Sequence, residues 1–270
     1  MMTSVQISTD NFPKIAYQKI GSGNALVLLH GFPERGSLWN RVTDALSKHF
    51  LVIIPDIPGS GASALPTTTV TLPILASSIK AIIDNEKITE VVLAGHSMGG
   101  YIALAFAEQY PELIKGLSLV HSTATADDEE RLIKRKRTIE IIQKGGKNAF
   151  MRELIPGFYS PKFKDNNQSV IATQIERGIE LAGESIIAFY SAMMQREDRR
   201  NVVQQLATPF QMIIGKEETI APMKVLLEQA ALANISFVHR YDDCVHMSMI
   251  EQPKLLTYDL INFTEYCYKR

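Results

Sequence analysis

Short apolar runs alternate with amphipathic stretches along most of the chain. The runs at 25–30 (ALVLLH), 50–55 (FLVIIP) and 91–94 (VVLA) are continuous, which is typical of strands that are buried on both faces of a sheet. Between the last two runs, helical spacing predicts a helix over 72–86 whose apolar face is formed by Leu72, Leu75, Ile79, Ile82 and Ile83. This alternation predicts an α/β fold with a mostly parallel sheet that helices cover on both faces.

The pattern changes between residues 122 and 206, where strand signals are few and helical signals are many. On either side of this segment, four further stretches have the composition of strands, namely 13–20, 114–120, 210–214 and 235–241. A last helix is expected from Pro253 to about Tyr266. We therefore expect a core formed by 1–121 and 207–270. Residues 122–206 are expected to form a helical lid that is inserted before the last core strands and is not an independent domain.

Composition narrows the classes of partner. The 270 residues carry a formal net charge of −1, so no basic surplus indicates nucleic acid or an anionic membrane surface. No apolar stretch approaches the length of a membrane span, and the start of the chain lacks the basic and apolar regions of a signal peptide. Cys244 and Cys267 are not in a CxxC spacing and are expected to be reduced thiols, which suits a cytoplasmic protein. The sequence leaves the oligomeric state open.

The segment GHSMGG carries the strongest chemical signal. Residues 95–99 match G-x-S-x-G between a predicted strand and a predicted helix, which is the context that this motif requires. The turn is so sharp that Ser97 should take a strained backbone conformation and stand above the sheet, and Gly95 and Gly99 allow strand and helix to approach. The dipole of the following helix favours negative charge at this point. We predict that Ser97 is a nucleophile.

The segment HGFP at 30–33 follows the first buried strand, where a loop that supplies hydrogen-bond donors is expected. Acyl transfer places negative charge on a carbonyl oxygen, and two backbone N–H groups can hold that oxygen. The N–H groups of Phe32 and of Met98, the residue after the nucleophile, are the predicted donors. His30 and His96 lie inside these two turns and are expected to shape them.

His246 lies in a loop between the last predicted strand and the last predicted helix. A serine hydroxyl needs a neighbouring base, and only this histidine lies in a loop late enough in the chain for the order serine, acid, histidine, since His239 falls within a predicted strand. A metal site formed by Asp242, Asp243, Cys244 and His246 is the alternative, but it lacks a second pair of ligands at metal spacing. We therefore predict that His246 is the base and that the protein holds no metal.

The stretch IIGKEETIAP at 213–222 supplies the carboxylate that such a histidine needs. A carboxylate fixes the tautomer of the imidazole and stabilises the imidazolium. The turn follows a predicted core strand and precedes the histidine loop, and it offers Glu217 and Glu218. Asp127 and Asp128, at the start of the helical segment, are the next candidates.

Five segments come in the order and spacing of one family: HGFPERGSLW, PDIPGSGAS, GHSMGG, IIGKEETIAP and CVHMSMIEQP. Through them the chain resembles the α/β-hydrolase superfamily, and within it carboxylesterases, enol-lactonases and cofactor-free haloperoxidase-like hydrolases. HGFPE is also similar to epoxide hydrolases and dehalogenases, but those have an aspartate where this chain has Ser97. The family's acid, usually Asp, corresponds to Glu218, whose side chain reaches roughly 1.5 Å further. The resemblance thus implies Glu218 as the acid, with Glu217 second.

The resemblance implies a serine hydrolase of esters or lactones that needs no cofactor and acts on a small to medium, largely apolar molecule. Lid residues expected to line its pocket are Phe158, Phe189, Tyr190 and Met193. Two alternatives remain: a C–C bond hydrolase or haloperoxidase-like enzyme on the same triad, and a ligand receptor with slow turnover.

Charged residues of the helical segment are expected mainly to face solvent. In the run 127–137, Asp127 and Arg131 are spaced to pair on a helix, as are Glu130 and Lys134. A second group consists of Arg196, Arg199 and Arg200. These arginines either receive a carboxylate of the substrate or, like the first run, form a solvated face.

Overall fold

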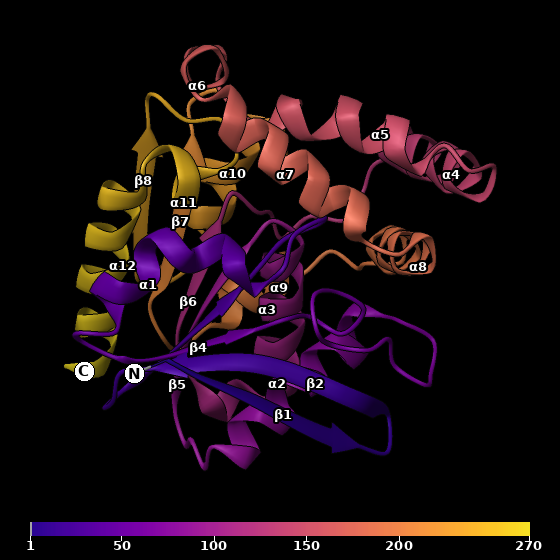
Figure 1. Ribbon diagram of the computed structural model, residues 1–270. Helices are drawn as coiled ribbons and strands as arrows, with labels where there is room; N and C mark the ends of the chain where they lie inside the picture. The colour runs from indigo at the N-terminus through magenta and orange to yellow at the C-terminus, as the bar shows by residue number, and fades with distance from the viewer. Residues whose placement is uncertain (1) are drawn as a thin grey trace.

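One eight-stranded sheet forms the centre of the molecule in the computed structural model, which describes residues 2–270 (Figure 1). The order of strands across the sheet is β1-β2-β4-β3-β5-β6-β7-β8. Pairing is antiparallel from β1 to β4 and parallel from β4 to β8. The strands are β1 (Thr3–Thr9), β2 (Phe12–Ile20), β3 (Ala25–Leu29), β4 (Leu51–Pro55), β5 (Val91–His96), β6 (Ile114–Val120), β7 (Phe210–Gly215) and β8 (Ser236–Tyr241).

Helices cover both faces of this sheet, as the alternation of apolar runs predicts. One group of packed helices consists of α1 (Asn40–Leu46), α11 (Ser248–Glu251) and α12 (Pro253–Tyr268). The other consists of α2 (Leu72–Asn85), α3 (Met98–Gln109), α9 (Arg200–Gln205) and α10 (Met223–Ala230). No helix among residues 2–270 combines the length and the apolar character that a membrane crossing requires.

Local sequence explains these elements. Every residue of β3, β5 and β7 is buried, which is the environment that continuous apolar runs require. The predicted helix 72–86 is α2, which begins after Thr71 because the hydroxyl of Thr71 accepts a hydrogen bond from the N–H of Ile74. The strand β1, at the edge of the sheet, lies outside the predicted elements, since only Val5 and Ile7 alternate with polar residues there.

The segment between β6 and β7 is helical and lies across one end of the sheet (Figure 1). It contains α4 (Glu129–Gln143), α5 (Lys147–Leu154), α6 (Pro161–Asn166), α7 (Gln168–Glu180), α8 (Gly183–Met194) and α9. Because β6 and β7 are parallel neighbours, the segment starts at the carboxyl end of β6 and returns to the amino end of β7. The carboxyl ends of the parallel strands therefore face these helices.

The charge run at the start of this segment is only partly a solvated face. Glu130 and Lys134 pair at 2.6 Å, as their spacing predicts. Asp127, however, is fully buried and pairs with Arg135 at 2.6 Å and with Arg196 at 2.7 Å, and not with Arg131. This difference arises because Asp127 precedes the first turn of α4, where Asp128 caps the helix, so helical spacing does not apply to it.

Candidate active site

Ser97 forms the sharp turn between β5 and α3. Its φ of 51° and ψ of −117° lie outside the regions that L-residues usually adopt, as the motif predicts. A Cβ atom at Gly95 would overlap the backbone of Gly99, and one at Gly99 would lie 2.5 Å from the carbonyl oxygen of Leu29. Only glycine fits at these two positions, so the two glycines allow the turn that presents Ser97.

The HGFP loop lies directly against this turn. A Cβ atom at Gly31 would lie 2.7 Å from Nδ1 of His96 and 2.9 Å from the Cβ of Ser97. The next residue, Phe32, is therefore close to the serine. Met98 is the first residue of α3, so its N–H group has no acceptor within the helix. The two residues predicted to supply oxyanion donors thus both lie close to Ser97.

Two buried histidines fix these turns, as expected. Nε2 of His30 accepts a hydrogen bond from the N–H of Ile57 at 3.0 Å, and its Nδ1 lies 2.8 Å from the carbonyl of Gly31. Nε2 of His96 lies 2.9 Å from the carbonyl of His246. Burial lowers the pKa of both imidazoles, and the neighbouring His246 and His121 lower that of His96 further. Both rings are therefore neutral and structural.

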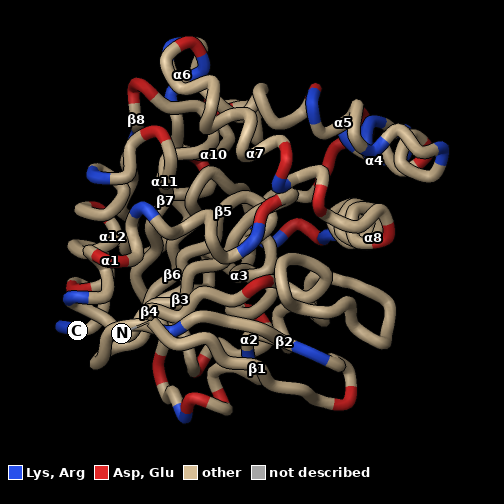
Figure 2. The backbone as a smooth tube through the Cα atoms, in the orientation of Figure 1, with Lys and Arg blue, Asp and Glu red and all other residues tan. Residues whose placement is uncertain are grey.

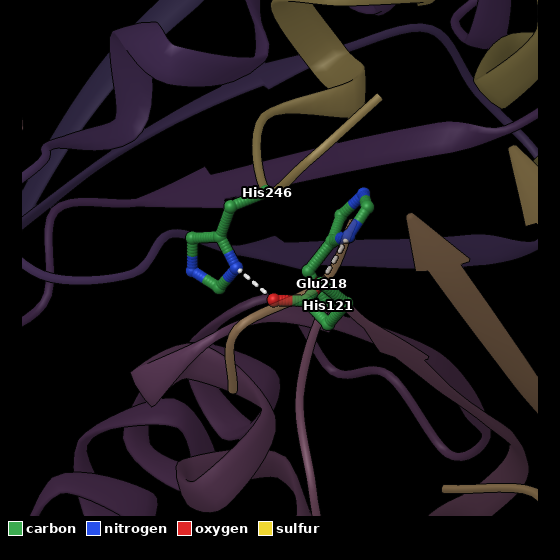
Figure 3. Close-up of side chains that lie close together, drawn as sticks. All are labelled: His121, Glu218 and His246. Carbon is green, nitrogen blue, oxygen red and sulfur yellow. Dashed lines mark hydrogen bonds and ion pairs between the residues drawn. The ribbon is translucent and has the colours of Figure 1, made fainter. Parts of the chain in front are cut away.

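Glu218 and His246 meet at the carboxyl ends of β7 and β8. Nδ1 of His246 lies 2.9 Å from Oε1 of Glu218, and both side chains are almost fully buried (Figure 3). Glu217, in contrast, is exposed. The N–H of His246 donates to the carbonyl of Phe158 at 3.1 Å, which ties the histidine loop to the helical segment. Of the two candidate carboxylates, only Glu218 contacts the histidine.

Glu218 receives further hydrogen bonds. Its Oε1 accepts from the backbone N–H groups of Thr219 at 2.9 Å and Ile220 at 3.1 Å, and its Oε2 lies 2.7 Å from Nδ1 of His121. Burial by itself raises the pKa of this carboxyl. The charges and hydrogen bonds of His246 and His121 outweigh that effect and hold the pKa of Glu218 well below its usual range. The carboxylate is therefore ionised at neutral pH although it is buried.

His121 is the residue of this network that the sequence does not reveal. It follows β6, has a positive φ of 50°, and points its ring at the carboxylate from the side opposite His246 (Figure 3). Its Nε2 lies 3.8 Å from the Sγ of Cys244, which in turn donates to Glu251 at 3.4 Å. Burial and Glu251 raise the pKa of the Cys244 thiol, so it stays protonated. The available signal was a histidine at the end of a core strand, next to the predicted lid.

His121, Glu218 and His246 also have the composition of a metal site, with nitrogen and oxygen atoms within 4.8 Å of one another. Ligands of a tetrahedral zinc ion lie roughly 3.3 Å apart, given Zn–N and Zn–O bonds of about 2 Å. Here each Nδ1 is at hydrogen-bond distance from the carboxylate, so the three side chains are bonded to one another. The alternative set at 242–246 is not brought together, because Asp242 pairs with Arg240 at 3.2 Å on the surface.

A cavity of about 310 Å³ lies over the serine, between the sheet edge and the helical segment. Ser97, His246 and Phe32 contribute to its wall. Its apolar wall includes three of the predicted lid residues, Phe158, Tyr190 and Met193, together with Phe150 and Leu154. Cavities of this size accommodate small organic molecules.

Phe189 and the three arginines at 196, 199 and 200 do not line this cavity. Phe189 does not line the cavity but packs edge-on against Phe32, with ring centroids 6.5 Å apart. Arg196 and Arg199 are buried in ion pairs with Asp127 and Glu108, and Arg200 pairs with Asp198 at the surface. Two of these three arginines are therefore structural, because each is buried and held in place by an ion pair with a carboxylate.

Comparison with known proteins agrees with this architecture. The model of the alpha/beta hydrolase fold family matches residues 24–139, which include the HGFP loop and the serine turn. A thermophilic esterase from Thermogutta terrifontis, solved with malate bound, superposes with a TM-score of 0.92 at 26% identity, covering 98% of this chain and 99% of that one. The chain has the α/β-hydrolase fold.

Other proteins to which the chain is similar include a lactonase and an esterase. The enol-lactonase from Burkholderia xenovorans LB400 has a TM-score of 0.88 at 22% identity, over 96% of this chain and 99% of that one. A pimeloyl-[acyl-carrier protein] methyl ester esterase from Xanthomonas oryzae is 28% identical over 221 residues, which cover 79% of this chain and 84% of the relative. Curated relatives with 33% identity match over only 125 residues, and the match spans 37% of their length.

Proposed function

We propose that this chain is a serine hydrolase that cleaves carboxylic esters or lactones through an acyl-enzyme. The observation that carries the proposal is the ionised Glu218 bonded to Nδ1 of His246, beside a cavity that His246 shares with Ser97. Esterase and lactonase relatives support the choice of bond.

In this mechanism the hydroxyl oxygen of Ser97 attacks the carbonyl carbon while Nε2 of His246 takes the hydroxyl proton. The N–H groups of Phe32 and Met98 hold the resulting oxyanion. The carbon–oxygen bond to the leaving group then breaks, and His246 returns its proton to that oxygen. In the second half, His246 activates water, which attacks the acyl carbon and releases Ser97 and the acid.

Glu218 keeps His246 in the tautomer whose Nε2 can accept a proton, and it stabilises the imidazolium that follows. His121 holds the other carboxylate oxygen, Oε2, and the backbone N–H groups of Thr219 and Ile220 donate to Oε1, which also contacts His246. Residues 122–206 act as the lid, since they contribute the apolar wall of the cavity and contact the histidine loop through Phe158.

A fluorophosphonate label and a neutral ester such as 4-nitrophenyl butyrate test the proposal together. The label should attach to Ser97, as identified by peptide mass spectrometry, and block hydrolysis of the ester. Ser97→Ala should lose the label and lower kcat by about three orders of magnitude or more. A Ser97→Ala preparation that keeps substantial, label-resistant esterase activity would overturn the assignment.

A further inference from the structure

One wall of the cavity is cationic. Arg131, Lys134 and Arg135, on successive turns of α4, all line it, and no Asp or Glu side chain of residues 2–270 does. Figure 2 shows Lys and Arg positions along α4, in the helical layer over the sheet. The opposite wall is apolar. The cavity therefore combines an apolar body with positive charge on one side.

Arg131 is the group best placed to bind an added anion. Its guanidinium donates one hydrogen bond to the carbonyl of Thr219 at 3.0 Å, and among the described residues no carboxylate lies within ion-pair distance of it. It is half-buried, so solvent screens its charge only in part. Lys134, by comparison, pairs with Glu130 at the surface.

Next to this cationic wall, a single carboxylate forms ion pairs with two arginines. Asp127 pairs with both Arg135 and Arg196, and all three side chains are largely or fully buried. The trio therefore keeps a formal charge of plus one. The guanidinium of Arg196 lies 4.2 Å from the ring centroid of Tyr101, and that of Arg135 lies 5.3 Å from that of Tyr190. Both tyrosines line the cavity.

The hydroxyl of Tyr101 also indicates that the cavity binds a hydrogen-bond acceptor. Tyr101 is 2% exposed and contributes to the cavity wall, and its hydroxyl has no hydrogen-bond partner within the described part of the chain. A buried hydroxyl without a partner costs free energy unless something in the cavity bonds to it. A carboxylate of the substrate would accept from such a hydroxyl and from a guanidinium.

We propose that the preferred substrate is an ester or lactone that carries a second, anionic carboxylate, which Arg131 binds. This rests on the proposed function, because Ser97 must cleave the ester while the carboxylate lies at α4. The apolar wall takes the carbon chain between the two groups. Lys134 and the charged trio around Asp127 raise the local potential that attracts the anion.

Matched pairs of a carboxylate and its neutral amide test this charge preference. Monomethyl adipate and methyl adipamate place the charge on the acyl side, and 4-acetoxybenzoate and 4-acetoxybenzamide place it on the leaving group. We expect kcat/KM to favour the anion in at least one pair by about tenfold or more. Arg131→Gln should remove that preference mainly through KM, with a much larger loss for the carboxylate than for the amide. Arg137→Gln is the control, because Arg137 is exposed on α4 and does not line the cavity.

Two results would overturn the proposal: no anion preference in either pair, or an equal loss for carboxylate and amide in Arg131→Gln. Hydrolysis of neutral esters that still depends on Ser97 would then leave the proposed function intact. Calorimetry with Ser97→Ala separates binding from turnover. In at least one of the two pairs, the carboxylate should bind more tightly than its amide, and only when Arg131 is present. Equal binding within both pairs would contradict the role of Arg131 even if no ester is hydrolysed.

Discussion

Glu218 and Glu34 are both buried carboxyl groups close to the serine turn, yet their surroundings differ. Glu218 receives two backbone N–H bonds and faces two imidazoles, and its pKa lies well below the usual range. Glu34 follows the HGFP loop and is 5% exposed, and no Lys or Arg nitrogen of residues 2–270 lies within ion-pair distance of it. Burial raises its pKa to about 7, although Arg177 and Arg35 oppose the shift.

The contrast indicates that the charges and hydrogen-bond donors around a buried carboxyl, and not its depth of burial alone, decide whether it is ionised. The nearest polar partner of Glu34 is the side-chain amide of Gln174 at 2.9 Å, which can bond to either the protonated or the ionised form. The backbone N–H groups around Glu218 can only donate hydrogen bonds. A carboxylate that orients an imidazolium must stay ionised, so it needs surroundings like those of Glu218.

The largest effect is expected for Glu218→Gln. The amide keeps the shape of the side chain but favours the wrong imidazole tautomer, and the comparable change in another triad lowers kcat on the order of 10⁴-fold. Steady-state kinetics on one neutral ester should show this loss. Glu217→Gln is the matched control and should behave as the parent, because Glu217 is exposed. If the Glu217 variant is inactive while the Glu218 variant is active, the acid of the triad is Glu217.

Glu34→Gln should change stability and hardly change activity. Between the pKa of an unfolded carboxyl and about 7, the native state binds more protons than the unfolded chain, so the free energy of unfolding falls as pH rises. Glutamine does not titrate and removes that slope. From about pH 5 to about pH 8, the free energy of unfolding of the variant should rise by about 2–3 kcal/mol relative to that of the parent. Denaturant unfolding at both pH values measures this difference, and parallel pH profiles would contradict it.

His121 should have a smaller effect. His121→Ala removes one donor from Glu218, and we expect kcat to fall about tenfold, as for loss of one hydrogen bond to a charged group. His121→Asn should restore most of the activity, because its amide can donate at the position of Nδ1 and asparagine tolerates a positive φ. If both variants lose equal activity, the imidazole does more than hold the carboxylate.

Local motifs explain why Ser97, His246 and Glu218 could be chosen from the sequence. Each follows a predicted strand, and in a parallel sheet those ends meet at one edge. The fold followed from the same alternation of apolar runs. The strand β1 was not predicted, because it lies at the edge of the sheet and contains few apolar residues.

The missed features depend on contacts between distant residues. His121 bonds to Glu218, 97 residues later, only because β6 and β7 are neighbours and φ of His121 is positive. Asp127 was expected beside Arg131, but it pairs with Arg196, which lies in the loop after α8. Helical spacing identifies neighbours along one helix. It cannot show which side chains from distant parts of the chain pack against that helix.

The ionisation of Glu218 is the point on which the account depends most, and ¹³C NMR of glutamate labelled at the carboxyl carbon measures it directly. The Glu218→Gln and Glu34→Gln variants assign the two resonances. The account predicts that the Glu218 carboxyl stays ionised throughout a titration from about pH 8 to about pH 5, while the Glu34 carboxyl titrates with a midpoint of about 7. A Glu218 resonance that moves to the protonated position within this range would contradict the account.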